Sequence, residues 1–245
     1  MKKSILENID IVLAGTLKSG NVGSVARAMN NMGLSNLKLV KPQCTIDDQA
    51  FWMATHGADI LRNAKTFPTI RDAIADCSYV FGTTARSRRW REFLCPEEMS
   101  EKVAVLARQN RISIVFGPED MGLSNDDLEL CNQVVSIPTA DEAASLNVSH
   151  AVMVICYEIF RAVEKKNETH ETMELAEGEK VEEMYDHMRK ALLEIGYLNP
   201  QNPDHVMGKF RRILTRAGLT SQDVKLIRGV FRQLLWYIKK KGSPS

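Results

Sequence analysis

The chain has 245 residues, 44% of them hydrophobic, and a formal net charge of +1. This composition is enough to bury a real core in one large domain, or in a domain with a smaller companion. The charge excludes a protein whose whole surface binds polyanions. Because no run approaches the roughly 18 apolar residues of a membrane span, and because we expect no signal peptide, we predict a cytoplasmic protein without a membrane partner.

The five cysteines form no CxxC pair, and no histidine stands at ligand spacing beside them. Structural zinc sites need close pairs of ligands. We therefore expect no zinc or other metal, and free thiols in a reducing compartment. The cysteines are Cys44, Cys77, Cys95, Cys131 and Cys156.

The first part of the chain alternates between short apolar runs and helical patterns. The runs are β-branched or aromatic and lack polar alternation, as in strands that are buried on both faces. They are residues 9–14, 37–40, 79–82, 112–116 and 134–137. Helices are predicted over 23–32, 70–76, 97–109, 125–131 and 147–165. This alternation predicts an α/β fold with a parallel sheet and helices on both faces. Gly33 is placed to end the first helix.

The pattern changes after this domain, which we expect to span residues 1–165. Residues 164–180 contain six Glu, three Lys and few apolar residues, a composition typical of a solvated linker, so we place an acidic linker at 166–180. Beyond it, apolar residues recur at helical spacing. They predict helices over 181–195, 206–214 and 224–238, within a helical extension that spans 181–245.

Charge is divided unevenly between these parts. Residues 1–163 carry 17 basic and 19 acidic residues, whereas residues 205–241 carry 10 basic residues and one acid, Asp223. Such a segment is typical of proteins that bind a phosphate backbone. The alternative is that the basic residues only solvate a small bundle. Two sets of basic residues recur at helical spacing, so each set should form a stripe along its helix. The sets are Lys209, Arg212 and Arg216, and Lys225, Arg228 and Arg232.

The first of three notable loops follows the first strand and reads GNVGSVARAM over residues 20–29. Its glycines would let backbone approach a ligand ahead of a helix. The loop lacks the Lys-Ser/Thr pair of a P-loop and the third glycine of the dinucleotide fingerprint. Taken alone, Arg27 could be a surface residue.

The second loop, FGPEDMGLSN over residues 116–125, follows a buried strand. Its glycines and proline fix a tight path, and Ser124 can cap the next helix. Glu119 could be an ordinary exposed acid.

The third segment joins Ile137-Pro138 to ASLN at residues 144–147, where the long apolar helix opens. Ser145 or Asn147 could be no more than the N-cap of that helix.

In this order, the three segments resemble the motifs of the SPOUT class of RNA 2'-O-ribose methyltransferases: NxGSxARA, FGPExxGLS and IP…SLN. With the segment 82–88 and the basic tail, the resemblance covers nearly the whole chain and is closest to the TrmJ-type tRNA (cytidine/uridine-2'-O-)-methyltransferases. One departure is Gly-Pro-Glu-Asp at 117–120, where that branch more often has Gly-Arg-Glu-Arg. The resemblance implies a trefoil knot at the end of the α/β domain and a homodimer.

The resemblance also implies S-adenosylmethionine (SAM) as cofactor, no metal, and tRNA rather than DNA as partner. The cofactor site would be formed by Thr83, Thr84, Ala85, Gly117, Ile137, Ala144, Ser145 and Leu146. Arg27 matches the catalytic arginine, either as general base or, as we prefer, as a phosphate clamp that stabilises the developing alkoxide, because a guanidinium normally stays protonated. The other catalytic or positioning residues would be Asn21, Glu119, Ser145 and Asn147.

We expect RNA contacts from Arg86, Arg88, Lys209, Arg211, Arg212, Arg216, Arg228 and Arg232. The target expected from the resemblance is position 32 of the tRNA anticodon loop, but another tRNA or rRNA ribose stays open. Two other classes remain as alternatives. A catalytically silent RNA-binding module would not bind SAM, and an unrelated α/β enzyme would bind NAD or ATP instead.

Overall fold

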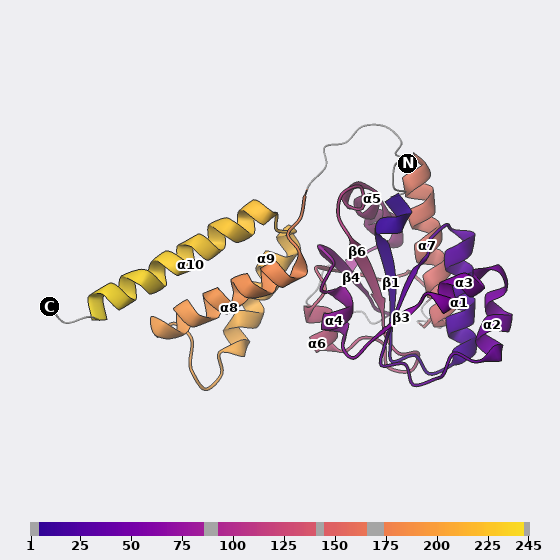
Figure 1. The fold of residues 1–245 in the computed structure, drawn as a ribbon, viewed down its shortest axis with the longest axis horizontal. Coiled ribbons are helices and arrows are strands. Elements are labelled where there is room, and N and C mark those ends of the chain that lie inside the picture. Colours follow the sequence, from indigo (N-terminus) through magenta and orange to yellow (C-terminus); the bar gives the residue numbers. More distant parts are fainter. Residues whose placement is uncertain (1–4, 86–92, 141–144, 166–173, 243–245) are drawn as a thin grey trace. The chain divides into compact units, whose positions relative to one another are not determined.

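The computed structural model describes residues 5–85, 93–140, 145–165 and 174–242. The chain divides into two compact units, and the second begins at Glu174 (Figure 1). Within the described ranges, no helix is both long and apolar enough to cross a membrane.

The first unit is built on a seven-stranded sheet in the order β3-β2-β1-β6-β4-β7-β5. All strand pairs are parallel, as the sequence predicts. The strands are β1 (Ile9–Ala14), β2 (Asn36–Val40), β3 (Lys65–Phe67), β4 (Tyr79–Thr83), β5 (Phe93–Leu94), β6 (Ile112–Phe116) and β7 (Gln133–Val135). Because every strand runs in the same direction, the loops that follow β1, β4, β6 and β7 meet at one edge of the sheet.

Helices cover both faces of this sheet (Figure 1). On one face, α1 and α5 each pack against α7, and α4 and α6 cover the other. The long helices are α1 (Ser19–Asn31), α5 (Pro96–Leu106) and α7 (Val148–Lys165). The short ones are η1 (Ile5–Asn8), α2 (Asp48–Ala54), η2 (Thr55–Gly57), α3 (Ala58–Arg62), α4 (Ile70–Ile74) and α6 (Asn125–Glu129).

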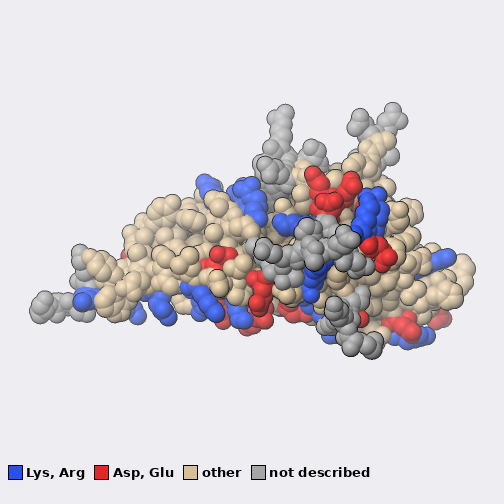
Figure 2. All heavy atoms as spheres, turned by 90° about the horizontal axis from the view of Figure 1, so that it is seen from above, with Lys and Arg blue, Asp and Glu red and all other residues tan. Residues whose placement is uncertain are grey.

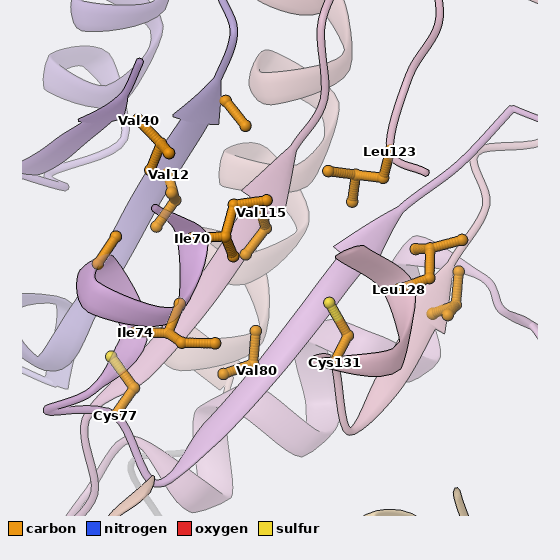
Figure 3. Close-up of a cluster of buried hydrophobic side chains, with 13 residues drawn as sticks. Val12, Val40, Ile70, Ile74, Cys77, Val80, Val115, Leu123, Leu128 and Cys131 are labelled. Carbon is orange, nitrogen blue, oxygen red and sulfur yellow. The ribbon is translucent and has the colours of Figure 1, made fainter. Parts of the chain in front are cut away.

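Figure 3 shows the core between the sheet and the pair α4 and α6. Val12 and Val115 project from neighbouring strands toward Ile70 and Ile74 of α4, and Leu128 joins them from α6. Burying each such side chain contributes roughly 1.5–3 kcal/mol. The alternate residues of β1 are equally buried on the opposite face, which explains the absence of polar alternation in the sequence.

The predicted start of the first helix at residue 23 is wrong, because α1 already begins at Ser19 and residues 20–22 are helical. Gly23 lies inside the helix, and a Cβ there would stand 2.1 Å from the carbonyl oxygen of Ala50 in α2. Its lack of a side chain therefore lets two helices pack closely and does not bring backbone to a ligand. The end of α1 is as predicted, since Gly33 follows it with φ +72°.

A buried charge cluster lies at the amino ends of the central strands. The Lys38 ammonium is 2.8 Å from Asp10 and 2.6 Å from Asp76, and it donates to the Ala73 carbonyl at 2.7 Å. Arg111 forms a second ion pair with Asp10, at 2.7 Å. Asp10, Asp76 and Cys77 also lie close enough together to hold a cation, but Lys38 already supplies the positive charge there.

The second unit consists of α8 (Gly178–Glu194), α9 (Asp204–Ala217) and α10 (Ser221–Gly242), which confirms the three predicted helices. Its core is small, and α8 supplies half of its buried residues, Met184, Tyr185, Met188 and Leu192, which Met207 of α9 joins. At the end of α9, Gly218 adopts the left-handed conformation that favours glycine.

The linker predicted over 166–180 is too long at its carboxyl end. Residues 166–173 lie outside the described residues, but Leu175 and Ala176 are 3% and 1% exposed. Leu175 forms an antiparallel bridge with Thr220, and the Ala176 amide donates to the Leu219 carbonyl at 2.8 Å. These two apolar residues tie an otherwise acidic segment to the helical unit.

Candidate active site

A pocket of about 310 Å³ lies at the carboxyl ends of β4, β6 and β7. Its walls come from the loops after these strands and from the start of α7. Its apolar lining includes Leu123, Val135, Ile137 and Leu146. Open parallel sheets bind ligands at this edge, because neighbouring loops diverge there.

The structure brings seven of the eight predicted cofactor residues together in this pocket; Ala144 lies outside the described residues. The seven are Thr83, Thr84, Ala85, Gly117, Ile137, Ser145 and Leu146. Three loops far apart in the sequence therefore share one cavity.

Gly117 shapes the pocket through a close backbone approach. A Cβ at this position would lie 2.3 Å from the carbonyl carbon of Gly122 and from the amide nitrogen of Leu123. The loop closes on itself through a hydrogen bond of 2.8 Å from the Gly122 amide to the Pro118 carbonyl. Any side chain at Gly117 would force this loop open.

Thr83 and Thr84 have structural bonds of their own. The Thr83 hydroxyl donates to the Val115 carbonyl at 3.1 Å, and the Thr84 amide donates to the Val135 carbonyl at 3.0 Å. These bonds join β4 to its two neighbours where the strands end. The two threonines therefore hold the pocket wall in place while they line it.

A polar network next to the pocket joins residues from all three motifs. Glu119 accepts hydrogen bonds from the Asn21 side chain at 2.8 Å and from the Leu17 amide at 3.0 Å. Asn147 in turn donates to the Asn21 side-chain oxygen at 3.2 Å. Since Glu119 also lines the pocket, the network fixes the position of a carboxylate at its rim.

Asn147 has a second function as the N-cap of α7. Its side-chain oxygen accepts from the Ser149 amide at 2.9 Å and from the Ser149 hydroxyl at 2.7 Å. The capping alternative is thus correct for Asn147, which takes part in the network at the same time. Ser145 is exposed and lines the pocket.

Arg27 neither lines this pocket nor belongs to the polar network beside it. It is exposed on α1, three residues beyond Ser24 and six beyond Asn21, and it is not among the residues that line the cavity. Among the described residues, no ion pair involves it. Within one chain, the pocket and Arg27 are separate features.

Several pocket residues were missed in the sequence. Met121, Leu123 and Thr139 line the cavity, as does Ala151 one turn into α7. The first three lie within or just after the motif loops, so their place after a buried strand was the available signal. Ala151 carries no polar group that could have marked it.

Family models match both units of the chain. Residues 8–157 match the SpoU rRNA methylase family, and residues 179–243 match the tRNA methyltransferase TrmJ, C-terminal domain. The "tRNA (cytidine/uridine-2'-O-)-methyltransferase TrmJ" of Citrobacter koseri is 41% identical over 237 residues, which cover 94% of this chain and 97% of that relative. The chain belongs to the TrmJ branch of the SpoU methylase family.

Solved structures of similar proteins agree with this assignment. TrmJ from Z. mobilis ZM4 is similar with a TM-score of 0.79 and 30% identity, covering 92% of this chain and 98% of that one. A probable methylase family protein from Haemophilus influenzae has a TM-score of 0.64 and 33% identity, covering 96% and 99%. The similarity to TrmJ therefore includes the helical unit.

In this TrmJ-type C-terminal unit, the predicted RNA-binding residues separate into two groups. Arg211 is half-buried, bonded to Glu182 at 2.9 Å, with its guanidinium 4.3 Å from the centre of the Tyr185 ring. This arginine holds α9 to α8, which argues against an RNA-binding role. Exposed cations remain at Lys209, Arg212, Arg216 and Arg232, and Arg228 is partly exposed. Arg86 and Arg88 lie outside the described residues.

Proposed function

We propose that this protein transfers a methyl group from SAM to the ribose 2'-hydroxyl of a cytidine or uridine in tRNA. The observation that carries the proposal is the network of Asn21, Glu119 and Asn147 beside the pocket, because it joins all three motifs of a methyltransferase family at one place. Relatives whose printed names give this activity support it along 94% of the chain. Position 32 of the anticodon loop is the target that the family resemblance implies.

The pocket suits SAM in size and chemistry. Its volume falls within the roughly 300–1,000 Å³ typical of small-molecule sites. Leu123, Val135 and Ile137 offer apolar walls to an adenosine, and Gly117 keeps a backbone wall free of side chains. When bound, this cofactor supplies an activated methyl group on a sulfonium.

The residues of the chain then have to orient a weak oxygen nucleophile and stabilise the charge that develops on it. We assign the network of Asn21, Glu119 and Asn147 to positioning. Arg27 binds the neighbouring phosphate and stabilises the developing alkoxide, since a guanidinium presents fixed donors and keeps its proton.

A homodimer would reconcile the exposed Arg27 with a pocket that it does not line. Two large apolar side chains that lie three residues apart on α7 support such an association by their exposure: Tyr157 (49%) and Phe160 (37%). In the proposed dimer, Arg27 acts on the pocket of the partner subunit. Mixing Arg27→Ala chains with Gly117→Ala chains should then restore part of the activity that each variant lacks alone. No recovery in a sample that sediments as mixed dimers would contradict a shared site.

The function is tested with purified protein, an unmodified tRNA transcript and SAM that carries a labelled methyl group. Mass spectrometry of the digested RNA should locate a single 2'-O-methyl pyrimidine, at position 32. A matched transcript with a 2'-deoxy sugar at that position should accept no label. Label on a base, or on that deoxy transcript, would contradict the proposed reaction. A parallel reaction with an rRNA fragment tests the alternative that the methylated ribose belongs to rRNA.

A further inference from the structure

The helical unit contains a second cavity, which lies between α8 and α10. It has a volume of about 260 Å³ and is lined by His187, Lys225, Arg228, Gly229 and Arg232. Three cations and an imidazole thus surround it, and none of its lining residues is acidic. Figure 2 shows Lys and Arg side chains in a row along one edge of the helical unit, at the left.

Two side chains of this cavity are oriented by α8. Arg228 is held by Glu183 through an ion pair of 2.7 Å. The Nδ1 atom of His187 lies 3.0 Å from the Glu183 carbonyl oxygen. Because a carbonyl oxygen only accepts, Nδ1 donates this bond and Nε2 remains for another partner. Among the described residues, no ion pair involves Lys225 or Arg232.

Gly229 occupies the middle of a helix of 22 residues. Glycine at such a position costs roughly 1 kcal/mol relative to alanine. At Gly23 and Gly117, packing explains the glycine, because a Cβ there would collide with backbone. At Gly229 nothing lies within 4 Å of the position that a Cβ would take. No contact within the described residues accounts for it. Gly208 has the same open space, but Gly229 differs in that it lines the basic cavity, where close approach of a ligand would account for a glycine.

An apolar groove begins on the other side of the same glycine. Lys225 and Gly229 line it together with Leu226, Val230 and Tyr237. Leu226 is 69% exposed and Val230 is 57% exposed. A nucleotide has the matching character, because a phosphate is joined to a ribose and a flat base whose faces are apolar.

We propose that this region of α10, with His187 of α8, is a binding site for one nucleotide of the RNA substrate. The phosphate lies among Lys225, Arg228, Arg232 and His187, and the attached ribose and base extend across Gly229 into the apolar groove. This inference rests on the proposed function for its choice of RNA. Phosphate contacts add affinity and fix register without reading sequence.

The first test compares two glycine variants in the full-length chain. Gly229→Ala should raise the thermal stability of the helical unit and weaken tRNA binding about 3- to 10-fold, because its methyl group occupies the path of the nucleotide. Gly208→Ala is a matched control. Gly208 also lies inside a helix, α9, with open space around it, and it lines neither cavity. This variant should gain stability and bind tRNA normally. Equal tRNA affinities of the two variants would overturn the proposal.

The second test measures the salt dependence of tRNA binding for Lys225→Ala and Lys225→Arg. Loss of one phosphate contact should reduce the slope of log K against log salt by about 1. Lys225→Arg should keep the slope of the unaltered protein. An unchanged slope in Lys225→Ala would contradict a phosphate contact, and the apolar groove would then be a surface for another protein.

Methyl transfer separates this proposal from the proposed function. In Gly229→Ala, KM for tRNA should rise while kcat at saturating tRNA stays unchanged. A fall in kcat at constant KM would overturn the nucleotide site. If the unaltered protein bound tRNA with the predicted salt dependence but transferred no methyl group, the proposed function would fail and the nucleotide site would stand.

Discussion

Charge has different structural roles in the two units of the chain. In the first unit, Lys38 and Asp10 are 5% and 0% exposed and pair with each other inside the fold. Among the described residues of the helical unit, one residue of α9, Met207, and one of α10, Val224, belong to the buried core, and most cations are at the surface. We infer that the paired charges of the first unit stabilise the fold that carries the candidate active site. Surface charge in the second unit is available for a polyanion.

The largest expected effect comes from Arg27→Ala in the first unit. Removal of a group that stabilises the transition state should reduce kcat by about 10²–10³-fold, and SAM binding should stay nearly intact. Arg27→Lys should also lose much of the rate, because lysine is only a point charge. Single-turnover assays and calorimetry measure the two effects. Asn30→Ala, an exposed change one turn later on α1, is the control. Normal turnover by Arg27→Ala would show that Arg27 has no catalytic role.

The second prediction concerns the buried charge. Lys38→Met should reduce the free energy of unfolding of the first unit by about 1–3 kcal/mol, because the buried Asp10 loses one of its two cationic partners and keeps only Arg111. The melting of the helical unit should not change. Lys65→Met, on the neighbouring strand β3 but exposed, should cost little. Calorimetry of the unaltered protein and the two variants measures these changes in stability. Equal stability of Lys38→Met and Lys65→Met would be incompatible with a structural role for Lys38.

A smaller effect is expected for Arg211→Ala in the helical unit. Its ion pair with Glu182 and its contact with the Tyr185 ring are partly exposed, so their loss should cost about 1 kcal/mol. The affinity for tRNA should change less than in Arg232→Ala, a variant of an exposed cation. If Arg211→Ala bound tRNA more weakly than Arg232→Ala at equal stability, the assignment of a structural role to Arg211 and an RNA-binding role to Arg232 would be wrong.

The smallest predicted effect is the pH dependence from Asp76. Burial raises the pKa of Asp76, but the hydrogen bond from Lys38 and the charges of Lys38 and Arg111 outweigh it, so the pKa is lowered overall. A lowered pKa stabilises the fold above the unfolded value of about 3.9 and loses that contribution as the pH falls further. Asp76→Asn should therefore flatten the acid limb of the stability curve below about pH 4. Denaturant unfolding over a pH series measures this limb, and an identical acid limb in Asp76→Asn and the unaltered protein would contradict a stabilising role for the Asp76 carboxylate.

The sequence predicted the central sheet because its strands are buried on both faces. It missed β3 and β5, which have three and two residues, and Lys65 and Thr66 of β3 are exposed. It also missed α2, and without α2 the reason for Gly23 could not be found, because the glycine makes room for that helix.

For the sites, the motifs predicted which residues meet, since the loops after parallel strands converge. They could not reveal that Thr83 and Thr84 join strands, because their partners lie on β6 and β7. They likewise could not separate Arg211 from its exposed neighbours, since Glu182 and Tyr185 come from another helix. Charge counts show how many cations a segment has, whereas the fold determines which are already paired.

The division of labour between the units is tested most directly by tRNA binding across a salt series. Filter binding would compare the full-length protein with a chain that ends at Lys165. We predict that the shortened chain still folds and binds SAM, but binds tRNA more weakly and with a shallower slope of log K against log salt, because it has lost phosphate contacts. Equal affinities and equal slopes would mean that the basic helical unit is only a solvated surface.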